Sequence, residues 1–148
     1  MQNEGTAILT VSSAAAPPVL DLDADNSNGG GADYVATFTT GGPQIPVADT
    51  DVSITDADGT TIQSARIQIA INRQSDDVLI AGALPLGITA SSYNSFTGIL
   101  TLTGSATLAA YQTALHQVVF DTTSLSTADR IIQVTVNDGT ADSNVATT

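Results

Sequence analysis

The chain has 148 residues, which is enough for one domain with a core, and its 42% hydrophobic share excludes a disordered polyanion. It carries 15 acidic residues against three arginines and no lysine, and the net charge of -12 argues against nucleic acid or an anionic membrane as partner. The absence of cysteine excludes disulfides, thiolate metal sites and cysteine nucleophiles, and no apolar run reaches the ~18 residues of a membrane span.

Short β-type patterns separated by turn residues run through the chain. Pro17 and Pro18 end the first pattern and indicate a linker, so we expect an N-terminal strand and linker over 1–18 and a folded domain over 19–148. Within 62–71, Ile67, Ile69 and Ile71 recur at period two and predict one buried face. In chain order, strands are predicted over 6–13, 34–38, 51–55, 62–71, 78–82, 88–91, 99–104, 118–121, 130–138 and 143–148.

One segment departs from this pattern. In "SATLAAYQTALHQV", Leu108, Tyr111 and Leu115 recur at spacings of three and four, and Ser105 or Thr107 can cap a helix over 107–116. The fold class predicted is all-β, an antiparallel β-sandwich of about seven to eight strands with one short crossover helix. The chain stops in "NVATT", which is typical of the middle of a strand and favours a piece of a longer protein.

The stretch "VLDLDADNSNGGG" places Asp21, Asp23 and Asp25 two residues apart. In an extended strand these carboxylates would share one face at ~7 Å spacing, where each neighbouring pair repels by about 0.6 kcal/mol in water. No basic residue lies nearby, and such oxygen-rich clusters suit Ca²⁺, with Asn26 and Asn28 as further ligands. A solvated acidic linker is the alternative that the spacing leaves open.

Two further acidic turns are candidate metal ligands. Asp56 and Asp58 lie in "TDADGTT", and Asp138 begins "DGTADSN". Ordinary turn chemistry explains both equally well. An EF-hand is excluded because positions six and twelve counted from Asp21 are Asn26 and Ala32, and "GGGADYV" gives one partial copy of the RTX nonapeptide where a β-roll needs several.

The order of these motifs resembles a known family. "PVLDLDAD", "ADYVATFTTGG", "DVSITDADGTTIQSARIQI", "YNSFTGILTLTGSATLAAYQTALHQVVFD" and "ADRIIQVTVNDGTADSN" resemble the cadherin-like repeats of RTX-type bacterial adhesins, related to the CSPG-type cadherin-like family, over about 18–148. The resemblance implies an extracellular, Ig/cadherin-like sandwich strung in tandem, with calcium near domain junctions. It places Asp21, Asp23 and Asp25 in an entry calcium motif and Asp56, Asp58 and Asp138 in acidic turns. The "DxNDN" linker of animal cadherins is absent.

The function expected from the resemblance is a non-enzymatic, calcium-binding extender module of an adhesin or surface matrix protein, extracellular or on the cell surface. Its partners would be neighbouring repeats or copies of itself. His116 is the single histidine, and without a "GxSxG" or comparable frame no catalytic triad is predicted. We expect His116 to end the helix, where a partly cationic ring suits the dipole.

Two other functions stay open. The apolar stretch 6–13 before the Pro-Pro hinge is typical of a donor strand for the next subunit of a filament, with the tail of a preceding repeat or a leftover linker as the alternatives. Tyr93, Phe96 and Tyr111 suggest a module that binds a glycan or a protein at a cell surface, against core or turn packing as the alternative.

Overall fold

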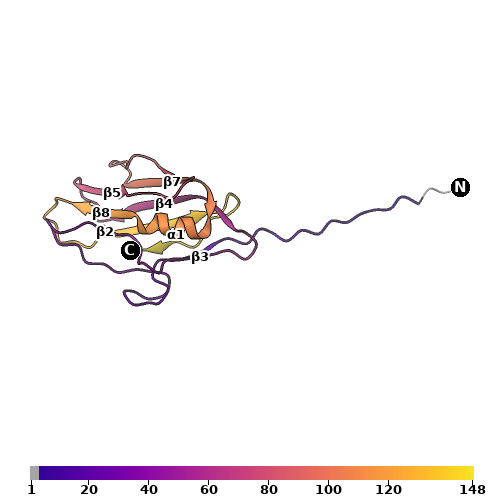
Figure 1. Cartoon of the computed structure of the whole chain (residues 1–148), viewed down its shortest axis with the longest axis horizontal. Helices are drawn as coiled ribbons and strands as arrows, with labels where there is room; N and C mark the ends of the chain where they lie inside the picture. The colour runs from indigo at the N-terminus through magenta and orange to yellow at the C-terminus, as the bar shows by residue number, and fades with distance from the viewer. Residues whose placement is uncertain (1–3) are drawn as a thin grey trace.

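The computed structural model describes residues 4–148 and shows two antiparallel sheets packed face to face (Figure 1). One sheet has the strand order β10-β9-β4-β7-β6 and the other the order β2-β8-β5, while β1 and β3 form a separate pair. Within these residues the elements are β1 (Val19–Asp21), β2 (Ile45–Pro46), β3 (Ser53–Thr55), β4 (Thr61–Ile71), β5 (Asp77–Ala81), β6 (Thr89–Ala90), β7 (Ile99–Thr107), α1 (Leu108–His116), β8 (Val118–Thr122), β9 (Ile131–Asn137) and β10 (Ala146–Thr147).

The larger sheet is formed by strands whose apolar residues alternate. Ile67 of β4 pairs with Leu100 of β7 on one side and with Val134 of β9 on the other, and all three are buried. The prediction that Ile71 shares this buried face is wrong, because the β4–β9 register shifts between Ile69 and Ile71. The shift leaves Ile71 50% exposed.

The smaller sheet covers this face with Leu79 of β5 and with Val118 and Phe120 of β8, which belong to the same core cluster. Phe38 packs edge-on against Phe120 at a centroid distance of 5.4 Å. The predicted all-β sandwich is therefore confirmed as an architecture.

Helix α1 follows β7 of the larger sheet and precedes β8 of the smaller one, so it is the predicted crossover. Thr107 is its N-cap, since its Oγ1 accepts a hydrogen bond of 3.1 Å from the backbone N–H of Ala110. Tyr111 and Leu115 are buried against the sheets, and the Tyr111 hydroxyl donates to Gly104 O at 2.8 Å. The predicted helix and one of its two predicted caps are thus confirmed.

Two predicted strands do not form. The segment 6–13 is extended and exposed and has no ladder partner within residues 4–148 (Figure 1). The segment 34–38 is also extended, and its residues are alternately half-buried and exposed. Its Tyr34 N–H donates to Thr147 O at 2.9 Å, but no ladder of bonds follows. No helix among the described residues is long and apolar enough to cross a membrane.

Candidate metal centre

The acidic loop begins where β1 ends. The Asp21 carboxylate accepts from the backbone N–H of Asp23 at 3.1 Å, and the Asn26 N–H then donates to Asp23 O at 3.0 Å, with Asn26 in the left-handed region at φ 55°. The chain therefore turns instead of continuing as a strand. The expected line of carboxylates along one strand face is wrong for this reason: Asp23 is fully buried, whereas Asp25 is exposed.

The turn encloses the Asp23 side chain in backbone donors. Its Oδ1 accepts from the Ser27 N–H at 3.1 Å, and its Oδ2 accepts from the Asn28 N–H at 2.6 Å. These bonds offset part of the free-energy cost of burying a carboxylate, and they fix both oxygens in place.

A second acidic loop, between β2 and β3, lies against the first. The backbone N–H of Asp49 donates to Leu22 O at 2.9 Å, which brings the two loops together. One carboxylate oxygen each from Asp23, Asp49 and Asp51 then lie within 4.8 Å of one another. Among residues 4–148 this is the single group of three or more potential side-chain metal ligands of this kind, and its three carboxylates form a cluster that could bind a metal ion.

None of the three arginines pairs with this acidic cluster. Arg66 bonds to Gln68, Arg73 bonds to backbone carbonyls of 95–96, and Arg130 pairs with Asp77. At 4.8 Å each pair of carboxylate charges repels by about 0.9 kcal/mol in water and more in a partly buried site. The arrangement carries unfavourable charge that a cation would neutralise.

Hydrogen bonds favour the ionised form of Asp49 and leave one oxygen of Asp51 without a partner among residues 4–148. The Thr50 N–H, and then the Asn28 amide, hold the pKa of Asp49 below its usual value. Asp51 Oδ2 accepts from the Asp25 N–H at 2.7 Å. Asp51 Oδ1 is buried and has no hydrogen-bond donor among residues 4–148. This oxygen is therefore a buried acceptor without a donor, and it belongs to a carboxylate that lies beside two others.

Tyr34 lies within electrostatic range of the acidic cluster. Burial raises the pKa of the Tyr34 hydroxyl first, and the negative charges of Asp49 and Asp23 raise this pKa further. A cation at the cluster would remove the second contribution, so the phenol is a natural reporter of binding.

The remaining predicted ligands of the first loop and of the β3–β4 turn make backbone hydrogen bonds. The Ser27 side chain, and then the Ser27 N–H, which donates to the Asp25 carboxylate at 2.9 Å, lower the pKa of Asp25. Asp56 accepts from the Asp58 N–H at 3.2 Å, and Asp58 accepts from the Ala16 N–H at 2.9 Å.

Asp138 caps the turn after β9. Its carboxylate accepts from the backbone N–H groups of Thr140 at 2.6 Å and Ala141 at 2.7 Å, and these bonds lower its pKa. Within residues 4–148, Asp23 is the one predicted ligand that belongs to a group of three carboxylates. A metal role for Asp21, Asp25, Asp56, Asp58 and Asp138 stays a prediction.

Sequence reasoning missed Asp49 and Asp51. They stand two residues apart in "ADTDV", which is the same alternation that drew attention to Asp21 and Asp23. The signal was therefore present in the local spacing. The pairing of the two loops, 26 positions apart from Asp23 to Asp49, was not visible without the fold.

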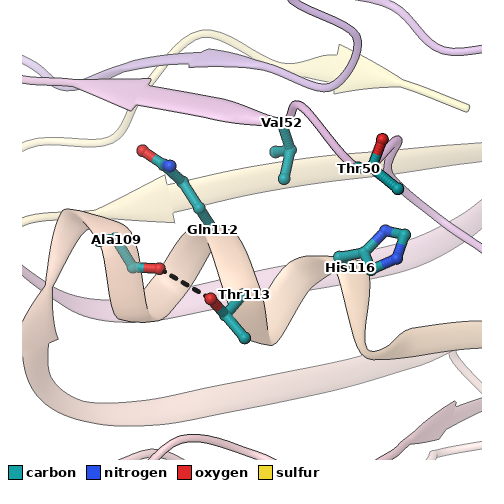
Figure 2. Close-up of a pocket in the computed structure, with 6 residues that line it drawn as sticks. All are labelled: Thr50, Val52, Ala109, Gln112, Thr113 and His116. Carbon is teal, nitrogen blue, oxygen red and sulfur yellow. Dashed lines mark hydrogen bonds between the residues drawn. The ribbon is translucent and has the colours of Figure 1, made fainter.

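His116 is the last residue of α1, as predicted, and contacts the backbone of the second acidic loop. Its Nδ1 lies 2.9 Å from Ala48 O. Figure 2 shows its ring beside Thr50, at one end of a shallow pocket of about 400 Å³ along the helix. The other residues lining that pocket are Val52, Ala109, Gln112 and Thr113, and Thr113 bonds back to Ala109 O. The ring fixes the helix end to the loop.

No family model, no curated protein and no solved structure matches the chain.

Proposed function

We propose that the chain is a non-enzymatic structural module that binds calcium, of the cadherin-like type found in extracellular bacterial surface proteins. One observation carries the proposal: an oxygen of each of three carboxylates lies within 4.8 Å of the others, and none of the three arginines pairs with them. The resemblance of the motif order to adhesin repeats and the acidic composition support the extracellular setting.

Calcium fits this cluster better than magnesium. The three carboxylates carry two oxygens each, and Ca²⁺ accepts six to eight oxygen ligands in flexible geometry, whereas Mg²⁺ demands a near-ideal octahedron and retains its waters. The Asn28 amide nitrogen lies 3.0 Å from Asp49 Oδ2, and rotation of this amide would present its oxygen as a further ligand.

The bound ion would tie together two loops at one end of the β1–β3 pair. The strands are antiparallel with Asp21 opposite Ser53, so Asp23 after β1 and Asp51 before β3 lie at the same end, and one ion would fasten the two strands to each other there. A ligand that binds only the folded state at about 100 times its Kd adds roughly 2.7 kcal/mol to stability. For extracellular modules the Kd is on the order of 0.1–1 mM, so calcium outside a cell would keep the module rigid.

Terbium luminescence tests the proposal, because Tb³⁺ replaces Ca²⁺ at oxygen sites and is excited through a nearby tyrosine. The chain has no tryptophan, and Tyr34 is the tyrosine whose pKa responds to Asp49 and Asp23. We expect saturable emission that Ca²⁺ displaces and that Tyr34→Phe removes, while Tyr93→Phe keeps it. Emission that is absent, or that is unaffected by Tyr34→Phe, would contradict a site at this cluster.

A further inference from the structure

A groove that shares none of the three clustered carboxylates is a second feature of the surface. It has a volume of about 550 Å³ and lies between segment 34–40, extended over 34–38, and the loop 124–130. Phe38, Ile45, Phe120 and Ile132 contribute apolar surface to its lining. Its lining is mostly uncharged.

One wall of the groove is an open strand edge. Tyr34, Ala36 and Phe38 are half-buried and alternate with exposed Val35 and Thr37, which is the period of a β-strand. The backbone N–H groups of 36–38 have no hydrogen-bond acceptor within residues 4–148. Such a row of unpaired groups is a template for an added strand.

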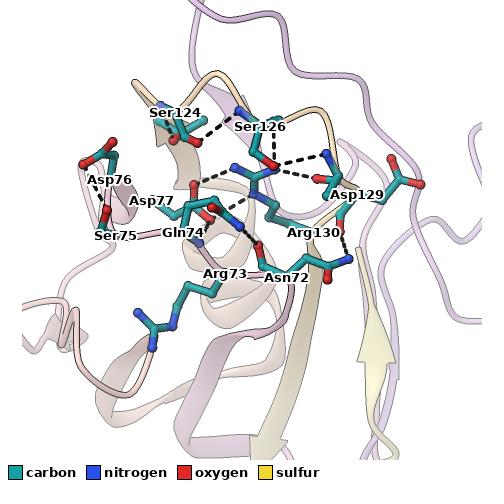
Figure 3. Close-up of polar contacts among 12 residues, drawn as sticks. Asn72, Arg73, Gln74, Ser75, Asp76, Asp77, Ser124, Ser126, Asp129 and Arg130 are labelled. Atoms are coloured by element: carbon teal, nitrogen blue, oxygen red, sulfur yellow. Dashed lines mark hydrogen bonds and ion pairs between the residues drawn. The ribbon is translucent and has the colours of Figure 1, made fainter.

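The opposite wall is fixed in place by a buried ion pair. The Arg130 guanidinium bonds to both Asp77 oxygens at 3.0 and 3.2 Å, and it also donates to the carbonyl oxygens of Ser126 and Ala128 (Figure 3). Asp77 is 2% exposed. These bonds fix the loop 124–130 to the smaller sheet, and the Thr40 hydroxyl, which donates to Ser124 O at 3.4 Å, joins the two walls at one end of the groove.

The chain also contains a strand-like segment that no other residue of 4–148 covers. Residues 5–13, "GTAILTVSS", are extended, uncharged and exposed, and Leu9 and Val11 are 87% and 84% accessible. At period two, Ala7, Leu9 and Val11 share one apolar face, while Thr6, Thr10 and Ser12 share the other face with Ile8. Figure 1 shows this segment leading away from its own sheets, where it can reach a second molecule.

We propose that segment 6–12 of one copy of this chain inserts into the groove of a second copy, as an added strand paired with 34–40. Both segments have seven residues, which is about 23 Å of strand, and the donor brings no charge to a protein of net charge -12. Leu9 and Val11 would face the apolar floor, and the backbone of 36–38 would gain its missing partners. In the copy that donates the strand, Pro17 and Pro18 would separate the inserted strand from the folded domain.

The contact is heterologous, because the donor segment and the acceptor groove are different surfaces. Repetition of such a contact builds a head-to-tail chain of copies. The weight-average mass of the full chain should therefore rise continuously with protein concentration in sedimentation equilibrium. A full chain that stays monomeric at millimolar concentration would overturn the proposal.

Two substitutions of equal exposure separate strand insertion from unspecific apolar contact. Leu9→Asp places a charge on the face that would enter the groove, and Ile8→Asp places the same charge on the face that would stay in water; these side chains are 87% and 86% exposed. We expect Leu9→Asp to weaken association by about tenfold or more, since burying an unpaired charge is costly, and Ile8→Asp to change it little. Equal effects of both, or no effect of Leu9→Asp, would overturn insertion of one face.

Disulfide trapping identifies the acceptor, because the chain has no cysteine of its own. Copies carrying Thr10→Cys are mixed with copies carrying Val35→Cys or Thr37→Cys, at exposed positions of the segment that lines the groove. A linked heterodimer is expected. The matched control is Leu86→Cys, a fully exposed position outside the groove. Trapping no faster than with this control would show that the segment docks elsewhere and would overturn the proposal.

Discussion

The Asp51→Asn variant should be more stable than the parent chain in chelator and less stable than the parent chain in calcium. In the absence of a cation, Asp51 repels Asp23 and Asp49, each through oxygens no more than 4.8 Å away. Each pair costs about 0.9 kcal/mol in water, so removing one charge relieves about 1.7 kcal/mol. The amide keeps an oxygen that can accept the Asp25 N–H. With roughly 2–4 °C per kcal/mol for a domain of this size, the variant should melt about 3–7 °C above the parent chain in chelator.

In calcium the order of the two melting temperatures should be reversed. The parent chain is expected to gain about 2.7 kcal/mol at 100 times Kd, or about 5–11 °C in Tm, and the variant to gain almost nothing. Differential scanning calorimetry in calcium, in magnesium and in chelator measures both shifts. Asp76→Asn is the matched control, because this substitution removes the same unit of charge at an exposed residue that bonds only to Ser75 among residues 4–148. An Asp51→Asn variant that melts below the parent chain in chelator, or that keeps the full calcium-dependent shift, would refute the reasoning.

Three other outcomes are expected. Calcium should lower the pKa of Tyr34, because the ion cancels the charges of Asp49 and Asp23. The pKa of Tyr111, which burial raises to about 12, should stay unchanged. NMR titration of the tyrosine ring carbons measures both pKa values, and equal shifts would argue against a local effect. Burial raises the pKa of Asp77, but the bond to Arg130, together with other hydrogen bonds, outweighs burial, so the pKa in the folded protein lies below its usual value. The ion pair should therefore stabilise the fold above pH ~4, and this stabilisation should be lost as the pH falls through the folded-state pKa. Asp77→Asn should cost about 3 kcal/mol in urea unfolding at neutral pH and flatten the acid limb, and an unchanged acid limb would contradict this role. Thr107→Ala should cost about 1 kcal/mol in the same assay, and a change below about 0.3 kcal/mol would mean that the cap is dispensable.

Local patterns were sufficient for most of the fold. The spacing of Leu108, Tyr111 and Leu115 predicted α1, and Thr107 was one of two predicted caps. The apolar alternation in β4 and β9 predicted the strands of the larger sheet. These predictions succeed because periodicity and capping depend on residues a few positions apart.

The sequence was less informative where a strand needs a partner. Segments 6–13 and 34–38 have strand-like alternation, but within residues 4–148 neither one meets a full set of backbone donors and acceptors. Alternation describes which side chains would be buried in a sheet, and it does not supply the neighbouring strand.

The candidate metal centre was predicted in part for the same reason. Asp23 was named from its spacing, but Asp21 instead accepts a backbone bond that ends the strand and rotates Asp23 away from Asp25. Asp49 and Asp51 join Asp23 only because the Asp49 N–H bonds to Leu22 O. Spacing along the chain can indicate that carboxylates are close to one another, but the pairing of distant loops decides which of them share an ion.

Calorimetric titration with Ca²⁺, carried out on the parent chain, Asp51→Asn and Asp76→Asn together, measures directly whether the clustered carboxylates bind the ion. We expect saturable binding to the parent chain and to Asp76→Asn, and its loss in Asp51→Asn, because the three clustered carboxylates hold the ion. No binding heat with the parent chain, confirmed by native mass spectrometry without a calcium adduct, would rule out a calcium site at this cluster. Undiminished binding by Asp51→Asn would also contradict such a site and would place calcium elsewhere on the protein.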